Sequence, residues 1–213
     1  MLKAVGQKRI KPGDATGTRE RIIASATETI KREGYSGTTA RAIAARGDFN
    51  QALIFYHFGG VDEVLLAALD GISERQMARY SEAISRVRTL EQGMIVAARL
   101  FETERRDGSV MVINEMIAAA NSKPELGPAI LARMQPWIDF TEGEIRRLLK
   151  GSPLARLVPA DDAAFALASL YLGMQMLTHL SGQTARSESV FGMGRRVARV
   201  LGTLVRATGG GKR

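Results

Sequence analysis

The chain has 213 residues but no cysteine, two histidines and a single tryptophan. Without cysteine it can have no disulfide framework, no thiolate metal site and no thiol nucleophile, and the composition suits a reducing cytoplasm, where we expect the protein. The histidines, His57 and His179, lie too far apart in sequence to form a ligand pair on one helix. No nucleophile–base pair and no phosphate-binding loop stands out. We therefore expect no metal, no cofactor and no enzymatic activity.

We also expect no leader and no long apolar run of the kind that crosses a membrane. The stretch from Met1 to Lys11 carries charges but no apolar segment. Residues 164–180 are apolar on nearly every side, yet this run is shorter than the ~20 residues that a span requires, and polar residues interrupt it. A helix that is apolar all round is otherwise a buried one. We expect no membrane segment, and a second subunit is the simplest cover for the outer face of this helix.

Acidic residues are scarce at the front of the chain. The formal net charge is +8. Residues 1–60 contain ten Lys/Arg against five Asp/Glu, whereas the remainder contains twenty against seventeen. A basic end on a soluble protein indicates a polyanionic partner, which is either nucleic acid or an anionic membrane surface. Charge alone does not choose between these two partners.

Apolar residues recur with a helical period almost throughout, and no stretch alternates with period two for long enough to require a strand. The predicted fold class is all-α, with about nine helices. These are expected at 18–34, 39–46, 50–57, 61 into the eighties, 91–106, 109–121, 125–149, 161–181 and 188–207. Thr18 is the expected first cap and Gly34 the expected first stop. The predicted organisation is a flexible basic arm (1–17), a helix-turn-helix domain (18–66), a ligand-binding and dimerisation domain (67–208) and a tail (209–213).

The most informative segment runs from Thr38 to Phe58. Thr39 is a good N-cap, and a turn around Gly47 and Asp48 separates two short helices, the second capped by Asn50. Ile43 and Ala44 in the first short helix, and Ile54 and Phe58 in the second, are spaced to face a core. Two short helices joined by a tight turn and packed on an amphipathic first helix form a helix-turn-helix, whose second helix enters the major groove of DNA.

The residues that remain outside this core are the candidate DNA contacts. Gln51 can pair with adenine, and Ala52 or Leu53 can touch a thymine methyl. Tyr56 and His57 can donate to phosphate oxygens, while Arg41 can reach a guanine edge or a phosphate. The full predicted set is Thr39, Arg41, Asn50, Gln51, Ala52, Leu53, Phe55, Tyr56 and His57, together with Lys8, Arg9 and Lys11 on the arm. A plain three-helix packing unit is the alternative interpretation, and for the arm a merely solubilising tail is as good an interpretation.

With Thr38-Thr39, the Ile43-Ala44 pair, Asn50 and the run Phe55-Tyr56-His57-Phe58, the sequence resembles the tetracycline-repressor (TetR) family of bacterial transcription regulators over about residues 18–66. The resemblance implies a homodimer with an N-terminal DNA-binding domain and a C-terminal domain for a small molecule, more often a repressor than an activator. Several positions depart from the family pattern: Asp48 at the turn glycine, Ala42 at the acidic capping partner, Phe55 at a phosphate-binding tyrosine and Val61 at a phosphate-binding lysine. Gly47 is then expected to supply the flexible turn residue, and the arm to restore the lost phosphate contacts.

The remainder of the chain is rich in methionine and aromatic residues with a few polar residues among them. A mostly apolar cavity with few polar groups is typical of a small-ligand site, and methionine suits an adaptable wall. The candidate ligand-binding residues are Phe101, Met111, Asn114, Glu115, Met134, Trp137, Tyr171, Met174, Gln175 and His179. An ordinary helical core is the alternative for each of them, and for His179 it is the favoured one. The expected effector is apolar or amphipathic.

Helices 161–181 and 188–207 are the predicted surface of a homodimer. The small residues Gly173, Gly192, Gly194, Ala198 and Gly202 would let helices approach closely, with Arg195, Arg196 and Arg199 on a solvated side. Intramolecular packing is the alternative. The overall hypothesis is a repressor of double-stranded operator DNA that an unknown small-molecule effector releases by a population shift. The alternative functions are a non-switching DNA-architectural protein and an anionic-surface-binding protein.

Overall fold

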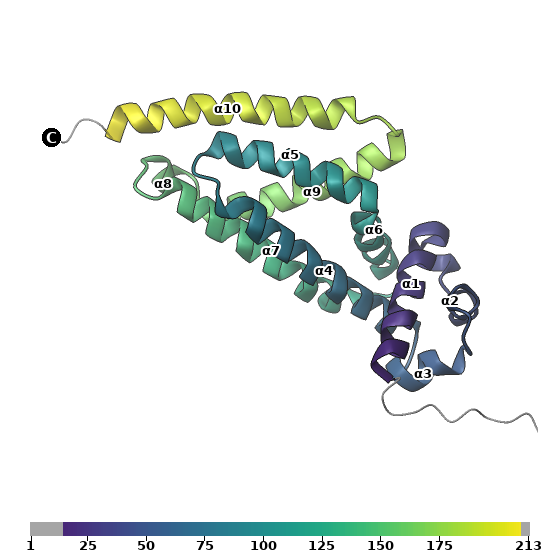
Figure 1. Cartoon of the computed structure of the whole chain (residues 1–213). Helices are drawn as coiled ribbons and strands as arrows, with labels where there is room; N and C mark the ends of the chain where they lie inside the picture. Colours follow the sequence, from purple (N-terminus) through teal and green to yellow (C-terminus); the bar gives the residue numbers. More distant parts are fainter. Residues whose placement is uncertain (1–14, 210–213) are drawn as a thin grey trace, which may run out of the picture. The chain divides into compact units, whose positions relative to one another are not determined.

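The computed structural model describes residues 15–209 of the chain, and within this range every regular element is a helix (Figure 1). The predicted all-α class is confirmed. The ten helices are α1 (Ala15–Gly37), α2 (Ala40–Gly47), α3 (Ala52–Phe58), α4 (Val61–Ser85), α5 (Leu90–Asp107), α6 (Ser109–Ala120), α7 (Leu126–Leu149), α8 (Leu154–Leu157), α9 (Ala160–Ser181) and α10 (Ala185–Gly209). The sequence predicted nine, and the additional one is the single-turn α8. There the Ser152 hydroxyl accepts from the Leu154 N–H at 3.0 Å, which starts one turn between two prolines.

The described chain divides into two compact units, residues 15–68 and 69–209. The first unit contains α1, α2, α3 and the beginning of α4, and its core is small. Ile22, Ala26 and Ile30 lie one helical turn apart on α1 and are fully buried with Ile43 of α2 and Ile54 of α3. This is the face that the apolar spacing predicts, because residues four apart share one side of a helix.

The beginning of α1 differs from the prediction, and its predicted end is a break in the helix. The helix begins at Ala15, so Thr18 lies inside the first turns as a buried residue and is not a cap. Gly34 adopts φ 67°, which is non-helical, but the chain continues as helix to Gly37. The Thr38 hydroxyl donates to the Gly34 carbonyl at 2.6 Å. Gly34 therefore interrupts the regular helix at the position where the sequence predicted its end, and one further turn follows to Gly37.

The second unit contains the rest of α4 and all later helices. Helix α5 lies along α10, and α7 lies along α9 (Figure 1). Thr89 caps α5 by accepting from the Gln92 N–H at 3.2 Å, and Gly108 ends it with φ 70° in the left-handed region that glycine tolerates. Buried side chains such as Phe101, Val112 and Ile130 hold these helices together.

Helix α9 is long and apolar enough to cross a membrane by length and composition alone. Only 17% of its most apolar stretch is buried within the subunit, so most of this stretch is left uncovered by the rest of the chain. Its exposed large apolar side chains are Phe165, Leu167, Leu170, Met176, Leu177 and Leu180, and those of α10 are Met193, Val197 and Val200. We call these nine residues the α9–α10 apolar face.

Candidate nucleic-acid interface and ligand cavity

The turn between α2 and α3 is built from local hydrogen bonds. Thr39 caps α2 as predicted, because its hydroxyl accepts from the Ala42 N–H at 3.1 Å. Asp48 follows the helix with φ 50° and ψ 58°, and its N–H donates to the Ala44 carbonyl. The Phe49 N–H donates to the same carbonyl at 3.1 Å. These two hydrogen bonds form the tight turn that connects α2 to α3.

Gly47 and Asp48 have roles opposite to those that the sequence suggested. Asp48, not Gly47, takes the left-handed conformation, which aspartate tolerates better than most residues. A Cβ at Gly47 would lie 2.3 Å from the Phe49 ring and 2.4 Å from the Ser25 hydroxyl. Glycine is therefore required at position 47 by the close approach of α1 and of the Phe49 side chain, and not by its φ angle.

The beginning of α3 is held by Asn50, as predicted, although the helix starts at Ala52. The Asn50 Oδ1 accepts from the Ala52 N–H at 2.9 Å, and its carbonyl accepts from the Leu53 N–H at 3.0 Å. With both acceptors of Asn50 directed at α3, Gln51 lies in the first turn without a capping role of its own. Its side chain is exposed.

Helix α3 buries one side and presents the other. Ile54 is fully buried, while Leu53, His57 and Phe58 are half-buried. Gln51 and Ala52 are exposed, and two aromatic side chains stand out with them: Phe55 is 54% exposed and Tyr56 is 80% exposed. Large aromatic groups are seldom left so open without a partner. The predicted DNA contacts Gln51, Ala52, Phe55 and Tyr56 therefore share one accessible surface.

His57 is less well placed than these neighbours. Its Nε2 is buried and has no hydrogen-bond partner among the described residues, and its ring meets the Tyr56 ring edge-on at 4.9 Å. The Arg19 side chain donates to the His57 carbonyl and lies 4.1 Å above the Phe58 ring. The α1 arginine thus secures the end of α3. A phosphate contact through Nε2 would require the ring to turn.

Two arginines of α2 have different surroundings. Arg46 donates to the Thr29 hydroxyl at 3.0 Å and to Glu33 at 2.6 Å, so it ties α2 to α1. Arg41 is exposed. Residues 15–60 contain six Lys/Arg against four Asp/Glu, a small basic excess. The predicted arm contacts Lys8, Arg9 and Lys11 lie outside the described residues.

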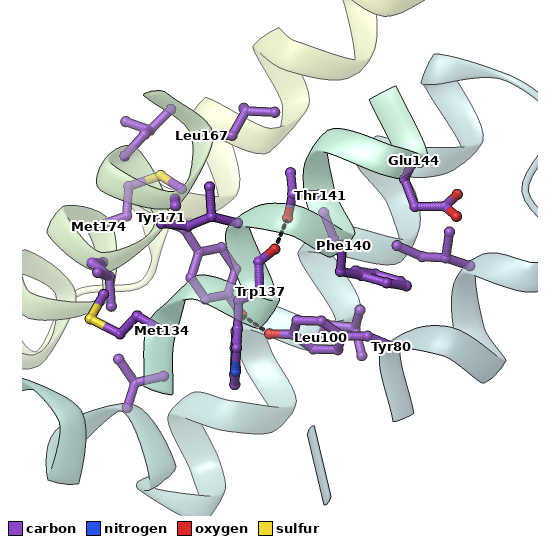
Figure 2. A pocket seen from close by; sticks show the side chains of 18 of the residues that line it. Tyr80, Leu100, Met134, Trp137, Phe140, Thr141, Glu144, Leu167, Tyr171 and Met174 are labelled. Carbon is purple, nitrogen blue, oxygen red and sulfur yellow. Dashed lines mark hydrogen bonds between the residues drawn. The ribbon is translucent and has the colours of Figure 1, made fainter. Parts of the chain in front are cut away.

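The second unit contains a cavity of about 300 Å³, at the lower end of the usual range for small-molecule sites (Figure 2). Its wall comes from α4, α5, α6, α7, α9 and α10 and is mostly aliphatic and aromatic. Trp137 of α7 meets Tyr80 of α4 edge-on at 5.2 Å, and its Nε1 donates to the Ser73 hydroxyl at 2.8 Å. Met134 and Met174 supply flexible thioether groups.

The cavity contains four of the ten predicted ligand residues: Met134, Trp137, Tyr171 and Met174. Phe101 and Gln175 are buried beside it, where the Gln175 Nε2 donates to the Phe101 carbonyl at 3.0 Å. Met111, Asn114 and Glu115 are half-buried on α6 but do not line the cavity, since that helix turns Val110 and Ile113 toward it. His179 is exposed on α9, and its predicted core position is wrong.

Sequence reasoning missed several lining residues. They are Ser73 and Tyr80 on α4, Arg133, Phe140, Thr141 and Glu144 on α7, and a series of aliphatic side chains. One usable signal was present on α4, where Leu69, Ile72, Ser73, Tyr80 and Ile84 recur at helical spacing and all line the cavity. The polar members of this set are hard to distinguish from surface residues without the partners that they contact.

A buried carboxyl lies behind the aromatic wall. Glu104 of α5 is 1% exposed and accepts hydrogen bonds from the Tyr171 hydroxyl at 2.6 Å and from the Tyr80 hydroxyl. Burial raises the pKa of the Glu104 carboxyl, and the hydrogen bonds from Tyr171 and Tyr80 oppose this shift. Burial likewise raises the pKa of both tyrosines, so their hydroxyls keep their protons. The two tyrosines thereby direct their hydroxyl groups at Glu104.

Gln76 is a second unusual polar residue on α4. It is 0% exposed, and neither its side-chain oxygen nor its side-chain nitrogen has a hydrogen-bond partner among the described residues. It lies between Ser73 and Tyr80 along the helix, one turn from each. A buried amide without partners costs stability.

Comparison with known proteins finds a family resemblance in the first unit. Residues 22–68 match the model of the bacterial regulatory proteins of the tetR family. The HTH-type transcriptional repressor Rv3405c of Mycobacterium tuberculosis is 37% identical over 54 residues, which are 25% of this chain and 29% of that protein, so the chain is aligned with less than a third of that relative.

Solved structures match over most of the chain. A TetR-family member from Streptomyces coelicolor A3 is 21% identical with a TM-score of 0.62, covering 86% of this chain and 96% of that one. The multidrug binding protein EbrR, complexed with imidazole, is 21% identical with a TM-score of 0.61, covering 86% and 93%. These likenesses show the fold. Family resemblance at the level of sequence is confined to residues 22–68, the part of the chain that contains most of α1 together with α2, α3 and the beginning of α4.

Proposed function

We propose that the chain is a transcriptional regulator that binds duplex DNA with the exposed side of α3, acts as a homodimer, and is released from its operator by an apolar effector in the cavity of its second unit. The observation that carries the proposal is the exposure of Gln51, Phe55 and Tyr56 on a short helix that a tight turn holds in place. A glutamine amide can pair with an adenine edge, and a tyrosine hydroxyl can donate to a phosphate oxygen.

The proposal is tested by selecting a duplex from a random pool and comparing its binding with that of a random duplex and of anionic vesicles over a salt series. A regulator should hold the selected duplex about 10³-fold or more tightly than the random one. Equal binding to all duplexes would support a DNA-architectural protein. Binding to vesicles in preference to DNA would support an anionic-surface protein.

Two exposed arginines offer a matched pair for the same assay. Arg41 belongs to α2 of the helix-turn-helix, whereas Arg32 lies on α1. If Arg41 contacts a phosphate, Arg41→Ala weakens binding to all duplexes and lowers the slope of log affinity against log salt by about one unit. Arg32→Ala should leave both quantities unchanged.

The homodimer is proposed from the α9–α10 apolar face. Monomeric proteins seldom leave so many large apolar side chains of two helices exposed to water, and a second copy supplies a matching face by two-fold symmetry. Gly173 and Gly202 are open, so that a neighbouring helix could approach them. Gly194 faces the Met94 side chain of α5, and Ala198 is buried within the subunit, so these two small residues serve intramolecular packing.

Effector binding is supported by the cavity and by the EbrR likeness, since that protein is described as binding multiple drugs. Repression is supported by the name of the mycobacterial relative. A homodimer should hold two α3 helices about 34–36 Å apart, one turn of DNA, and an effector that favours another separation releases the operator. Adding a bound effector should therefore weaken operator affinity. An effector that occupies the cavity without any change in operator affinity would contradict this part of the proposal.

A further inference from the structure

The charged groups at the border of the cavity are already neutralised by the protein. Among the described residues that line the cavity, Arg133 and Glu144 carry charge. The Arg133 Nε lies 2.9 Å from Asp70 Oδ1, its Nη2 lies 3.0 Å from Asp70 Oδ2, and its Nη1 donates to the Ala129 carbonyl at 2.9 Å. Glu144 accepts two hydrogen bonds from Arg147. Both hydrogen bonds on Glu144 are accepted by Oε2, so each of the two charged side chains already has a counter-charge within the protein.

The uncharged polar groups of the wall are occupied in the same way. The Thr141 hydroxyl donates to the Trp137 carbonyl at 2.8 Å (Figure 2). The Trp137 Nε1 donates to the Ser73 hydroxyl. Tyr80 and Tyr171 donate to Glu104. The wall therefore offers a ligand rings, methyl groups and thioethers, with few open donors.

From these contacts we infer that the cavity selects an uncharged, apolar effector, and that Asp70 sets this selectivity by withholding Arg133 from the ligand. A carboxylate ligand would have to displace Asp70 from a two-pronged ion pair or enter without a counter-ion, and the second alternative is costly in an apolar site. A cationic ligand would have to compete with Arg147 for Glu144. An uncharged ligand with the same carbon skeleton needs no counter-ion and does not compete with Asp70 or Arg147. This inference rests on the proposed effector function.

Asp70 is a suitable position for a test because its side chain is 50% exposed, so that Asp70→Asn leaves no buried void. The change keeps the shape of the side chain and removes the charge that neutralises Arg133. Arg133 can then pair with a carboxylate in the cavity. The matched control is Glu102→Gln, which alters another acid–arginine pair, with Arg105 and Arg106, on residues that do not line this cavity.

The experiment titrates the full-length protein with decanol, decanoate and decyltrimethylammonium, which share one alkyl chain. Binding is followed by the fluorescence of Trp137, the single tryptophan of the chain, and by calorimetry. The wild type should bind decanol about tenfold or more tightly than either charged compound. Asp70→Asn should strengthen decanoate binding about tenfold and leave decanol binding unchanged, and adding Arg133→Met to it should abolish that gain.

The inference is overturned if the wild type binds either charged compound as tightly as decanol, or if Asp70→Asn leaves the ratio of decanoate to decanol affinity unaltered. Operator binding is measured separately on the same proteins without ligand. The absence of charge selectivity would therefore be distinguishable from a loss of operator binding. Conversely, decanol that binds without weakening operator affinity would contradict the proposed switch and leave the charge selectivity intact.

Discussion

The aromatic side chains of α3 in the first unit and those of the cavity in the second unit have opposite surroundings. In the first unit Phe55 and Tyr56 project from a short helix into solvent, above a core of small aliphatic residues. In the second unit Tyr80, Trp137 and Tyr171 turn inward and donate hydrogen bonds to other residues of the same unit. The first arrangement suits recognition of a large external surface, and the second suits a small apolar molecule. Exposure of aromatic groups and the satisfaction of their polar atoms thus distinguish a surface site from an enclosed one.

The largest effect is expected where the second unit does expose apolar residues. Leu177→Glu places a charge on the α9–α10 apolar face, where Leu177 is 67% exposed. Because the interface is two-fold, each dimer would bury two of these charges, one from each subunit. The dimer dissociation constant, measured by analytical sedimentation, should rise at least about 100-fold. Leu131→Glu on α7, where the leucine is 56% exposed, is the control. If both variants changed the dimer dissociation constant equally, or if neither changed it, the α9–α10 apolar face would not be the dimer surface.

The next effect sharpens the account of the turn in the first unit. Gly47→Ala forces a Cβ against the Phe49 ring and the Ser25 hydroxyl and should lower the free energy of unfolding by about 1–3 kcal/mol. Asp48→Gly at the adjacent position should change it by less than about 1 kcal/mol, because glycine accepts this φ angle but gives the unfolded chain more freedom. Chemical denaturation measures both variants. A harmless Gly47→Ala would show that close packing does not require this glycine.

A smaller effect of opposite sign is expected inside the second unit. Gln76→Leu replaces a buried amide that has no partner among the described residues with an apolar group of similar size. The free energy of unfolding should rise by about 1–2 kcal/mol, as measured by urea denaturation. Gln92→Leu is the control, because the Gln92 side chain accepts from the Arg88 N–H and its loss should destabilise. Destabilisation by Gln76→Leu would show that the amide makes a needed contact.

The smallest expected effect is a pH dependence of the free energy of unfolding that arises from Glu104. Because burial raises the folded pKa of Glu104, the stability contributed by its protonated form is complete below the ordinary glutamate pKa and is lost as pH rises through the folded value. Glu104→Gln should therefore gain stability relative to the wild type as pH rises above about 4.3. Hydrogen bonds from Arg105 lower the pKa of Glu102 to about 2, so Glu102→Gln should show a constant difference from pH 5 to 8. If the free energies of unfolding of Glu104→Gln and wild type changed in parallel with pH, the raised pKa of Glu104 would be contradicted.

The same contrast explains how much could be predicted from sequence. Thr39, Asn50 and the Ile43–Ile54 core were found because caps and helical spacing are local signals that residues a few positions apart carry. The role of Gly47 was missed because it depends on Phe49 and on Ser25, a residue of another helix. In the cavity, Met134, Trp137, Tyr171 and Met174 were found by residue type, while Tyr80 and Arg133 were missed.

The missed cavity residues share a physical cause. Tyr80 and Arg133 line the cavity because partners distant in sequence, Glu104 and Asp70, hold them there. His179 was misplaced because nothing in its local sequence distinguishes an outward helix face from an inward one on an apolar helix. Helix count and fold class follow from the periodicity of apolar residues, which can be read from a single sequence. Which side of each helix faces the core depends on the helices packed against it.

The central claim is that the exposed side of α3 reads a DNA sequence, and one affinity measurement tests it most directly. The double variant Gln51→Ala, Tyr56→Ala is compared with wild type and with Arg32→Ala for binding to a selected duplex at one fixed salt concentration. Both replaced side chains are exposed, so the fold should be retained, as circular dichroism can check. The account predicts a loss of about 100-fold or more in affinity for that duplex. Affinity equal to that of the wild type would contradict it.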